Sequence, residues 1–176
     1  MKRTLIILIA ASGLVGCATS GPPGPPPPPG PAYTPPSAPG AFRDSDFAWS
    51  TRSGADSIDG VMDYKPGRYT CKGTSVILAP ETPWSRARMR VLYLSTTAAA
   101  MPKADVEART PPQNAADYAR YARRSVCDGA NHFSFADLPD GPWFVITVAT
   151  PVSGGEQIAV MRRVVTHGGQ TRVRVP

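Results

Sequence analysis

The chain has 176 residues, of which 21 are proline and 16 are glycine, and its formal net charge is +6. Without Lys2 and Arg3, which lie in an N-terminal targeting segment, the formal charge falls to +4, an excess that favours anionic surfaces but names no partner. Without that segment and a proline-rich stretch, about 130 residues remain, so the length excludes more than one ordinary domain.

Residues 1–16 have the form of a secretory signal peptide. Lys2 and Arg3 give a positive start, and residues 4–14 are apolar or small. Eleven such residues are too few for a transmembrane helix, which needs about 20, but they fit the apolar region of a secretory signal.

The segment ends in Leu-Val-Gly-Cys at residues 14–17, which resembles the lipobox of bacterial lipoproteins. The resemblance implies cleavage between Gly16 and Cys17 and acylation of the Cys17 thiol and amino group. Residues 17–20 would then be the lipidated N-terminus, and three acyl chains would anchor it in a membrane. Because Ala18 replaces the Asp that retains such proteins at the inner membrane, the resemblance implies an outer-membrane location facing the periplasm. An ordinary signal peptide with a coincidental cysteine is the alternative.

Residues 21–40 contain eleven prolines and four glycines. Consecutive prolines favour polyproline II, and no apolar face exists to fold against a core. The composition therefore predicts a disordered spacer without a ligand of its own, and a proline-type ligand for an aromatic groove is the alternative.

Residues 41–176 form the predicted domain, in which short β-type segments alternate with turn signals. Phe42, Phe47 and Trp49 indicate that the lead-in packs on the domain. We expect strands at residues 57–64, 74–79 and 86–94, the last because Arg86, Arg88 and Arg90 alternate with apolar residues, and a turn followed by a short extended piece within residues 65–70.

The second half of the domain also alternates short β-type segments with turn signals, apart from one predicted helix within residues 111–124. In that helix Ala115, Tyr118 and Ala122 lie on one face. An Asp128–Gly129 turn separates two extended pieces, and residues 143–150 have no polar face, which predicts a central strand covered on both sides. Residues 156–175 predict a hairpin around residues 167–170.

These elements predict a mostly β fold, a β-sandwich with one short connecting helix. Residues 57–82 and 128–145 resemble the carboxypeptidase regulatory-like domain, of the transthyretin-like sandwich class, in their I-x-G, G-x-x-V-x-L-x-P-x-T and L-P-x-G-x-W-x-V elements. The resemblance covers about residues 57–150, and the stretch from 95 to 124 departs from the simplest members. It implies a non-catalytic accessory domain in which Leu138 plugs one end of the sandwich.

Cys71 and Cys127 are predicted to form a disulfide, because two thiols in an oxidising periplasm usually pair. A zinc site made by these cysteines with His132 and His167 is the alternative, but no C-x-x-C or H-x-x-x-H spacing supports it. We therefore expect no metal and no cofactor other than the covalent lipid on Cys17.

No motif marks a catalytic site, so the protein is predicted not to be an enzyme. His132 lies opposite Phe133 on its strand and His167 lies in a turn, and neither has a nucleophile with a motif beside it. Asp128, Asp137 and Asp140 read as turn residues, although calcium binding at one end of the sandwich is an alternative.

The arginines leave two functions open. Arg86, Arg88 and Arg90 are predicted on one strand face and Arg172 and Arg174 on another, and neighbouring strands would make one basic face. The first hypothesis is a non-enzymatic envelope lipoprotein that presents its sandwich for structural or protein-interaction roles. The alternative is a binding module for anionic envelope polymer, either lipopolysaccharide or peptidoglycan, through that face. The envelope location argues against nucleic acid as a partner.

Overall fold

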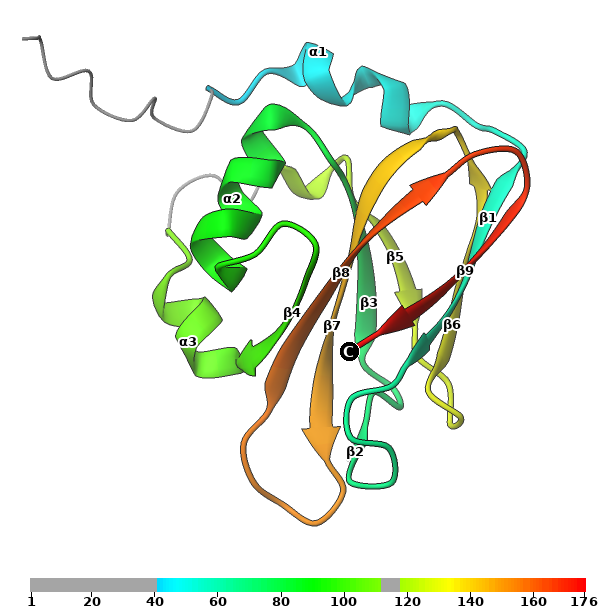
Figure 1. Cartoon of the computed structure of the whole chain (residues 1–176). Coiled ribbons are helices and arrows are strands. Elements are labelled where there is room, and N and C mark those ends of the chain that lie inside the picture. The colour runs from blue at the N-terminus through cyan, green and yellow to red at the C-terminus, as the bar shows by residue number, and fades with distance from the viewer. Residues whose placement is uncertain (1–40, 112–117) are drawn as a thin grey trace, which may run out of the picture. The chain divides into compact units, whose positions relative to one another are not determined.

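In the computed structural model of the chain, residues 41–111 and 118–176 are described, and they fold as two packed β-sheets with helices beside the larger sheet (Figure 1). The predicted signal peptide, the lipidated residues 17–20 and the spacer 21–40 lie outside the described residues. The predicted β-sandwich is confirmed. No helix of the described part is both long and apolar enough to cross a membrane.

The smaller sheet has the strand order β6-β1-β9. Its strands are β1 (Asp56–Met62), β6 (His132–Leu138) and β9 (Gln170–Val175). β1 is antiparallel to β6 and parallel to β9. Successive side chains of each strand point to opposite faces, so Val173 and Val175 are buried while Arg172 and Arg174 are exposed, as predicted.

The larger sheet has the strand order β4-β8-β7-β3-β5, and β2 pairs with β7. The bounds of its strands are β2 (Tyr69–Thr70), β3 (Ser75–Pro80), β4 (Ala98–Pro102), β5 (Arg123–Val126), β7 (Gly141–Pro151) and β8 (Ile158–Thr166). β7 is central, between β3 and β8, in agreement with the sequence.

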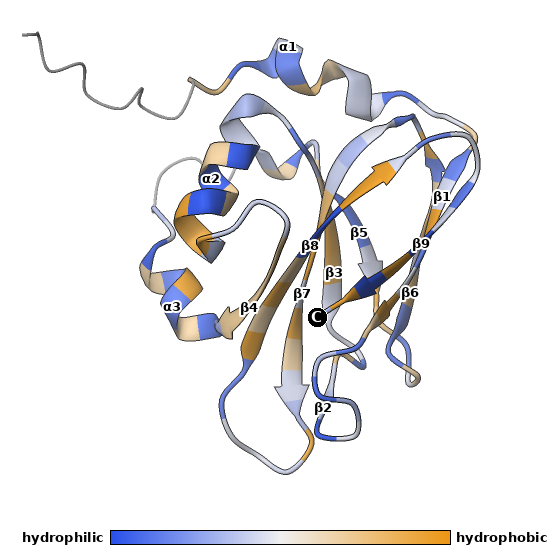
Figure 2. Ribbon diagram, viewed as in Figure 1, coloured by the Kyte–Doolittle hydropathy of each residue, from blue (hydrophilic) through white to orange (hydrophobic). Residues whose placement is uncertain are grey.

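Two hydrophobic layers explain why β7 has no polar face. Trp143 and Val145 are buried between the two sheets, where Ile58, Leu78 and the other core side chains meet. Phe144 points the other way and packs with side chains of the helices. Figure 2 shows hydrophobic stretches along β7 and β8, which agrees with a strand that is covered on both sides.

The strand predicted at residues 86–94 is wrong, because this segment belongs to helix α2 (Pro83–Tyr93). The helix begins with a capping box, in which the Ser85 amide donates to the Thr82 hydroxyl and the Thr82 amide donates to the Ser85 hydroxyl. Met89 and Tyr93 are buried at helical spacing. Val91, which the alternation placed with them, is 51% exposed.

The described residues contain further short helices that the sequence analysis missed: α1 (Asp44–Phe47), the 3-10 helix η1 (Ala48–Thr51) and α3 (Lys103–Ala108). The helix predicted within 111–124 falls partly on residues 112–117, which lie outside the described residues. Tyr118 and Ala119 are helical, whereas Arg123 and Arg124 begin strand β5, so the predicted end of that helix is wrong.

The turn predicted at residues 167–170 is present, but the two strands that flank it do not pair with each other, so the predicted hairpin over residues 156–175 is wrong. β8 pairs with β7 in the larger sheet, whereas β9 crosses to the smaller sheet and pairs with β1. Gly168 and Gly169 have φ angles of 68° and 126°, a region that glycine enters without steric cost. The Gly169 amide then donates to the Asp56 carboxylate at 2.5 Å, and its carbonyl accepts from the Ser57 amide at 3.2 Å.

The predicted disulfide between Cys71 and Cys127 is confirmed, with 5.6 Å between the two Cα atoms. Asn131 lies beside it, and its side-chain oxygen accepts hydrogen bonds from the Cys71 amide at 3.0 Å and from the Thr70 hydroxyl at 2.7 Å. The disulfide therefore joins the chain just before β3 to the chain just after β5. The disulfide also removes both thiols from the alternative zinc site.

Glu81 is buried before α2 and forms ion pairs with Arg86 and with Arg163 of β8, whose Nε donates to its Oε2 at 2.5 Å. We expect Glu81→Gln to lower the free energy of unfolding by about 2 kcal/mol, since a buried amide replaces the charge that both guanidinium groups contact. Urea denaturation should show this loss. Glu107→Gln, which breaks only an exposed pair with Lys103, should cost about 0.5 kcal/mol or less. Equal losses in the two variants would contradict a stabilising role for Glu81.

Candidate functional site

The outer face of the smaller sheet, which points away from the core, carries two rows of side chains set by the strand register. In each row, a residue of β1 has a residue of β6 on one side and a residue of β9 on the other. The rows are Ser134, Asp59 and Arg172, and His132, Val61 and Arg174. Residues far apart in the sequence are thereby neighbours on one surface.

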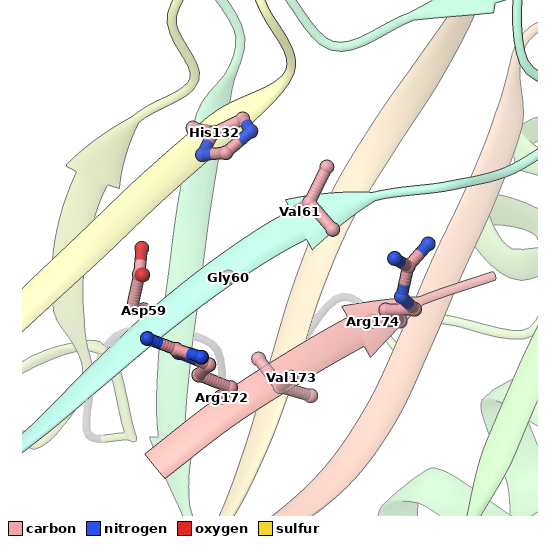
Figure 3. Close-up of a pocket in the computed structure, with 7 residues that line it drawn as sticks. All are labelled: Asp59, Gly60, Val61, His132, Arg172, Val173 and Arg174. Carbon is pink, nitrogen blue, oxygen red and sulfur yellow. The ribbon is translucent and has the colours of Figure 1, made fainter. Parts of the chain in front are cut away.

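This face is hollowed over β1 and β9. The hollow has a volume of about 450 Å³ and is lined by Asp59, Gly60, Val61, His132, Arg172, Val173 and Arg174. Figure 3 shows the Arg172 side chain extending across β1 toward Asp59, with Val61 between Arg174 and His132. The long arginine side chains beside the short Val61 form one wall of the hollow.

A second hollow, of about 230 Å³, shares Asp59 and His132 with the first. It continues past β6 to Ser125 and Val126 of β5 and to Asp128 in the following turn. We call the two hollows together the trough. The trough runs from β9 across β1 and β6 to β5.

The charged groups of the trough differ in how they are paired. Arg174 Nη1 donates to the Asp63 carboxylate at 2.9 Å. Arg172 forms no ion pair with any described residue. Asp128 Oδ1 accepts from the amides of His132 and Ala130, each at 2.8 Å, and these two hydrogen bonds hold the pKa of Asp128 below its usual value. Asp128 is therefore a charged carboxylate at neutral pH.

The arginine face predicted from the sequence is only partly present. Arg86, Arg88 and Arg90 lie on α2 beside the larger sheet, whereas Arg172 and Arg174 lie on β9 of the smaller sheet. Arg86 pairs with Glu81, and the Arg88 guanidinium lies 5.5 Å from the centre of the Trp84 ring. The prediction of one basic face made by all five residues is therefore wrong.

The trough also contains residues that the sequence analysis did not assign to a binding face. His132 was placed on the outward side of its strand, and it is exposed there. Asp59 alternates with buried residues along β1, which was a usable signal for an outward side chain. Their approach to Arg172 depends on the parallel pairing of β1 with β9, which no local pattern indicates.

Of the remaining predicted residues, His167 and Asp140 lie between strands, whereas Asp137 lies in β6, so its prediction as a turn residue is wrong. His167 Nδ1 is 3.2 Å from Asp140 Oδ2, and both side chains are exposed. The Asp137 carbonyl accepts from the Gly54 amide and from Arg123 Nη1, which ties β6 to the lead-in segment. Among the described residues, no three His, Cys, Asp or Glu side chains gather in a way that could hold a metal ion.

Comparisons with known proteins show the fold. No family model matches the chain, and no curated protein matches it. A crystal structure of a Pseudomonas aeruginosa protein, provisionally described as a carbohydrate binding protein, is similar with a TM-score of 0.54 and 18% sequence identity. The similarity covers 76% of this chain and 96% of that chain. At this identity the similarity shows a shared mostly β architecture.

Proposed function

We propose that this protein is a non-enzymatic, lipid-anchored component of a bacterial envelope that binds an anionic polysaccharide through the trough. The observation that carries the proposal is the pair Arg172 and Arg174, which project from β9 beside a hollow on an exposed sheet face. Guanidinium groups bind phosphate and carboxylate oxygens in a planar, two-point geometry. Because Arg172 has no ion pair with a described carboxylate, it is available to such a ligand.

The shape of the site favours a polymer over a small cofactor. Sites for small molecules usually enclose most of the ligand surface in an apolar pocket. The trough instead lies open on the surface, is lined by polar and apolar residues together, and continues across four strands. An extended chain that lies along the surface fits this arrangement.

Two resemblances support a polysaccharide as the ligand and a domain without catalytic residues. The Pseudomonas aeruginosa protein with the similar fold is provisionally described as a carbohydrate binding protein. The sequence elements of the carboxypeptidase regulatory-like class imply a non-catalytic accessory sandwich. Lipopolysaccharide and peptidoglycan are the anionic polymers that a protein anchored in the envelope would meet.

The surface gives less support to the alternative role, in which the sandwich docks on an envelope protein. Protein interfaces usually have a contiguous apolar core. The large exposed apolar side chains of the described residues are instead spread over α2, β5, β8 and the segment after β7. These side chains are Val91, Leu94, Val126, Val152 and Val165.

We expect the double variant Arg172→Gln and Arg174→Gln to bind lipopolysaccharide core oligosaccharide about tenfold more weakly than the unmodified protein, because hydrogen bonds to charged groups are lost. Isothermal titration calorimetry on the full chain in detergent measures this. The double variant Arg68→Gln and Arg90→Gln also removes two positive charges and is the matched control, since both side chains are exposed and neither lines the trough. Unchanged binding by the double variant, or an equal loss in the control, would refute the trough as the binding site.

The proposed lipid anchor at Cys17 can be tested separately from the trough. We expect Cys17→Ser to accumulate as an unprocessed precursor that takes up no labelled palmitate, because serine cannot form the thioether. Electrophoresis and autoradiography after metabolic labelling measure both effects. The matched control is Ser20→Ala, which changes the fourth residue after the predicted cleavage site and should be processed and labelled normally. Label in the Cys17→Ser protein would show that the lipobox assignment is wrong.

A further inference from the structure

We infer that the ligand of the trough is dipolar: an amino-sugar oligosaccharide whose phosphate or carboxylate lies at Arg172 and whose free ammonium group lies between Asp59 and Asp128. This inference rests on the proposed function and adds the charge pattern of the ligand. It follows from the separation of positive and negative side chains along the trough.

The two ends of the trough have opposite charge. Arg172 and Arg174 stand at the end formed by β9. Asp59 lies on β1 in the middle of the trough and lines both hollows, and past β6 the lining contains the carboxylate of Asp128, with the hydroxyls of Ser125 and Ser134 in the same hollow. A ligand with negative charge alone would be favoured at the first end and repelled at the second.

Asp128 is a fixed carboxylate at the acidic end. Its Oδ1 atom accepts two backbone amides of its own turn, which orients the side chain and keeps the carboxyl ionised. The neighbouring Cys127 is fixed by the disulfide to Cys71. Asp128 therefore lines the trough from a turn that is held in place, as a binding group requires.

Stacking of a neutral sugar has little support in this site. Neutral sugars are commonly bound by stacking on the exposed face of an aromatic ring, which supplies a large apolar contact area. Phe133 is the aromatic residue in the lining of the two described hollows, and it is only 4% exposed because its ring packs into the core over Gly60. Recognition must therefore come mainly from charged and hydroxyl groups.

The strand spacing sets the distance between the two charges of the ligand. Neighbouring strands lie about 4.8 Å apart, so β9 and β6 are separated by about 10 Å across β1. That distance is longer than one sugar ring. The anionic group and the ammonium group should therefore be on different rings of a disaccharide or longer fragment.

The test uses a β-1,6-linked glucosamine disaccharide with a phosphate on one ring and a free amine on the other, titrated into the full chain in detergent. Two matched probes are its N-acetylated form and its dephosphorylated form. We expect each change to weaken binding about fivefold or more, because each removes one charged contact. Asp59→Asn and Asp128→Asn should abolish the discrimination against N-acetylation, and Arg172→Gln should abolish the discrimination against dephosphorylation.

The controls separate the two proposals. Glu156→Gln removes an exposed carboxylate outside the trough and should keep both discriminations. Asp128→Asn retains a side-chain oxygen that can accept the amides of Ala130 and His132, and Asp59→Asn provides a second variant at a strand position. Equal binding of the amine and N-acetyl probes would overturn the dipolar ligand while leaving anionic binding intact. Binding of none of the three probes, or binding that Arg172→Gln does not change, would contradict the proposed function itself.

Discussion

Replacement of both Cys71 and Cys127 by alanine is expected to lower the free energy of unfolding by about 4 kcal/mol. The two residues are 56 positions apart, and a cross-link that closes a loop of this length removes that much chain entropy from the unfolded state. Both half-cystines are also buried in the main core, so the lost sulfur atoms add a small packing cost.

Urea denaturation of the oxidised protein, the reduced protein and the double alanine variant measures this effect. The reduced and alanine proteins should unfold at similar, lower urea concentrations, and reductant should leave the alanine variant unchanged. Ligand binding at the trough gives a second measurement, because Val126 and Asp128 flank Cys127 and line the acidic end of the trough. A midpoint for the reduced protein equal to that of the oxidised protein would show that the cross-link does not stabilise the fold.

Trp143→Ala is expected to cost about 4 kcal/mol of unfolding free energy, within the range for removal of a large aromatic side chain from a core. Trp143 is fully buried between the sheets, and its indole Nε1 donates to the Thr166 hydroxyl at 3.1 Å. Its ring also packs against Trp49, with 4.8 Å between ring centres, which attaches the lead-in segment to the sandwich.

Trp143→Phe separates these contributions, because phenylalanine keeps much of the apolar area and loses the hydrogen bond. We expect Trp143→Phe to cost clearly less than Trp143→Ala, and Val165→Ala at a half-exposed position of β8 to cost less than about 1 kcal/mol. Thermal and urea unfolding measure all three. Similar losses for Trp143→Ala and Val165→Ala would contradict the central place of Trp143 in the core.

Much of the sheet architecture could be predicted because alternation of buried and exposed residues is a local signal. β9 illustrates this, since Val173 and Val175 point to the core and Arg172 and Arg174 point outward, as the sequence indicates. β7 was recognisable for the opposite reason, because a strand with apolar residues on both faces must be covered twice. The disulfide followed from the redox chemistry of the predicted compartment.

The α2 segment shows how periodicity can mislead. Residues 86–93 alternate in a way that also places Met89 and Tyr93 on one side of a helix, so both readings bury these two side chains. Thr82, Pro83 and Ser85 decide between the readings, because together they cap the first turn. A search for helix-start signals at this position would have found the helix.

The trough could be predicted only in part, because it depends on contacts between strands that are distant in the chain. Arg172 and Arg174 were named as candidates from one strand. Their proximity to Asp59 and His132 requires β9 to leave β8 and pair with β1, and the turn at residues 167–170 looks the same for either partner. Sequence reasoning thus identified the basic residues of the candidate site, named Asp128 only as a turn residue or a calcium ligand, and missed Asp59.

An amide-resolved NMR titration of the isotope-labelled full chain with the phosphorylated glucosamine disaccharide tests the binding face most directly. The account predicts that the largest shifts occur on the outward residues of β6, β1 and β9, at Asp59, His132 and Arg172, and that they extend to Asp128. Shifts concentrated on α2 and the larger sheet, or no saturable shifts at all, would contradict it.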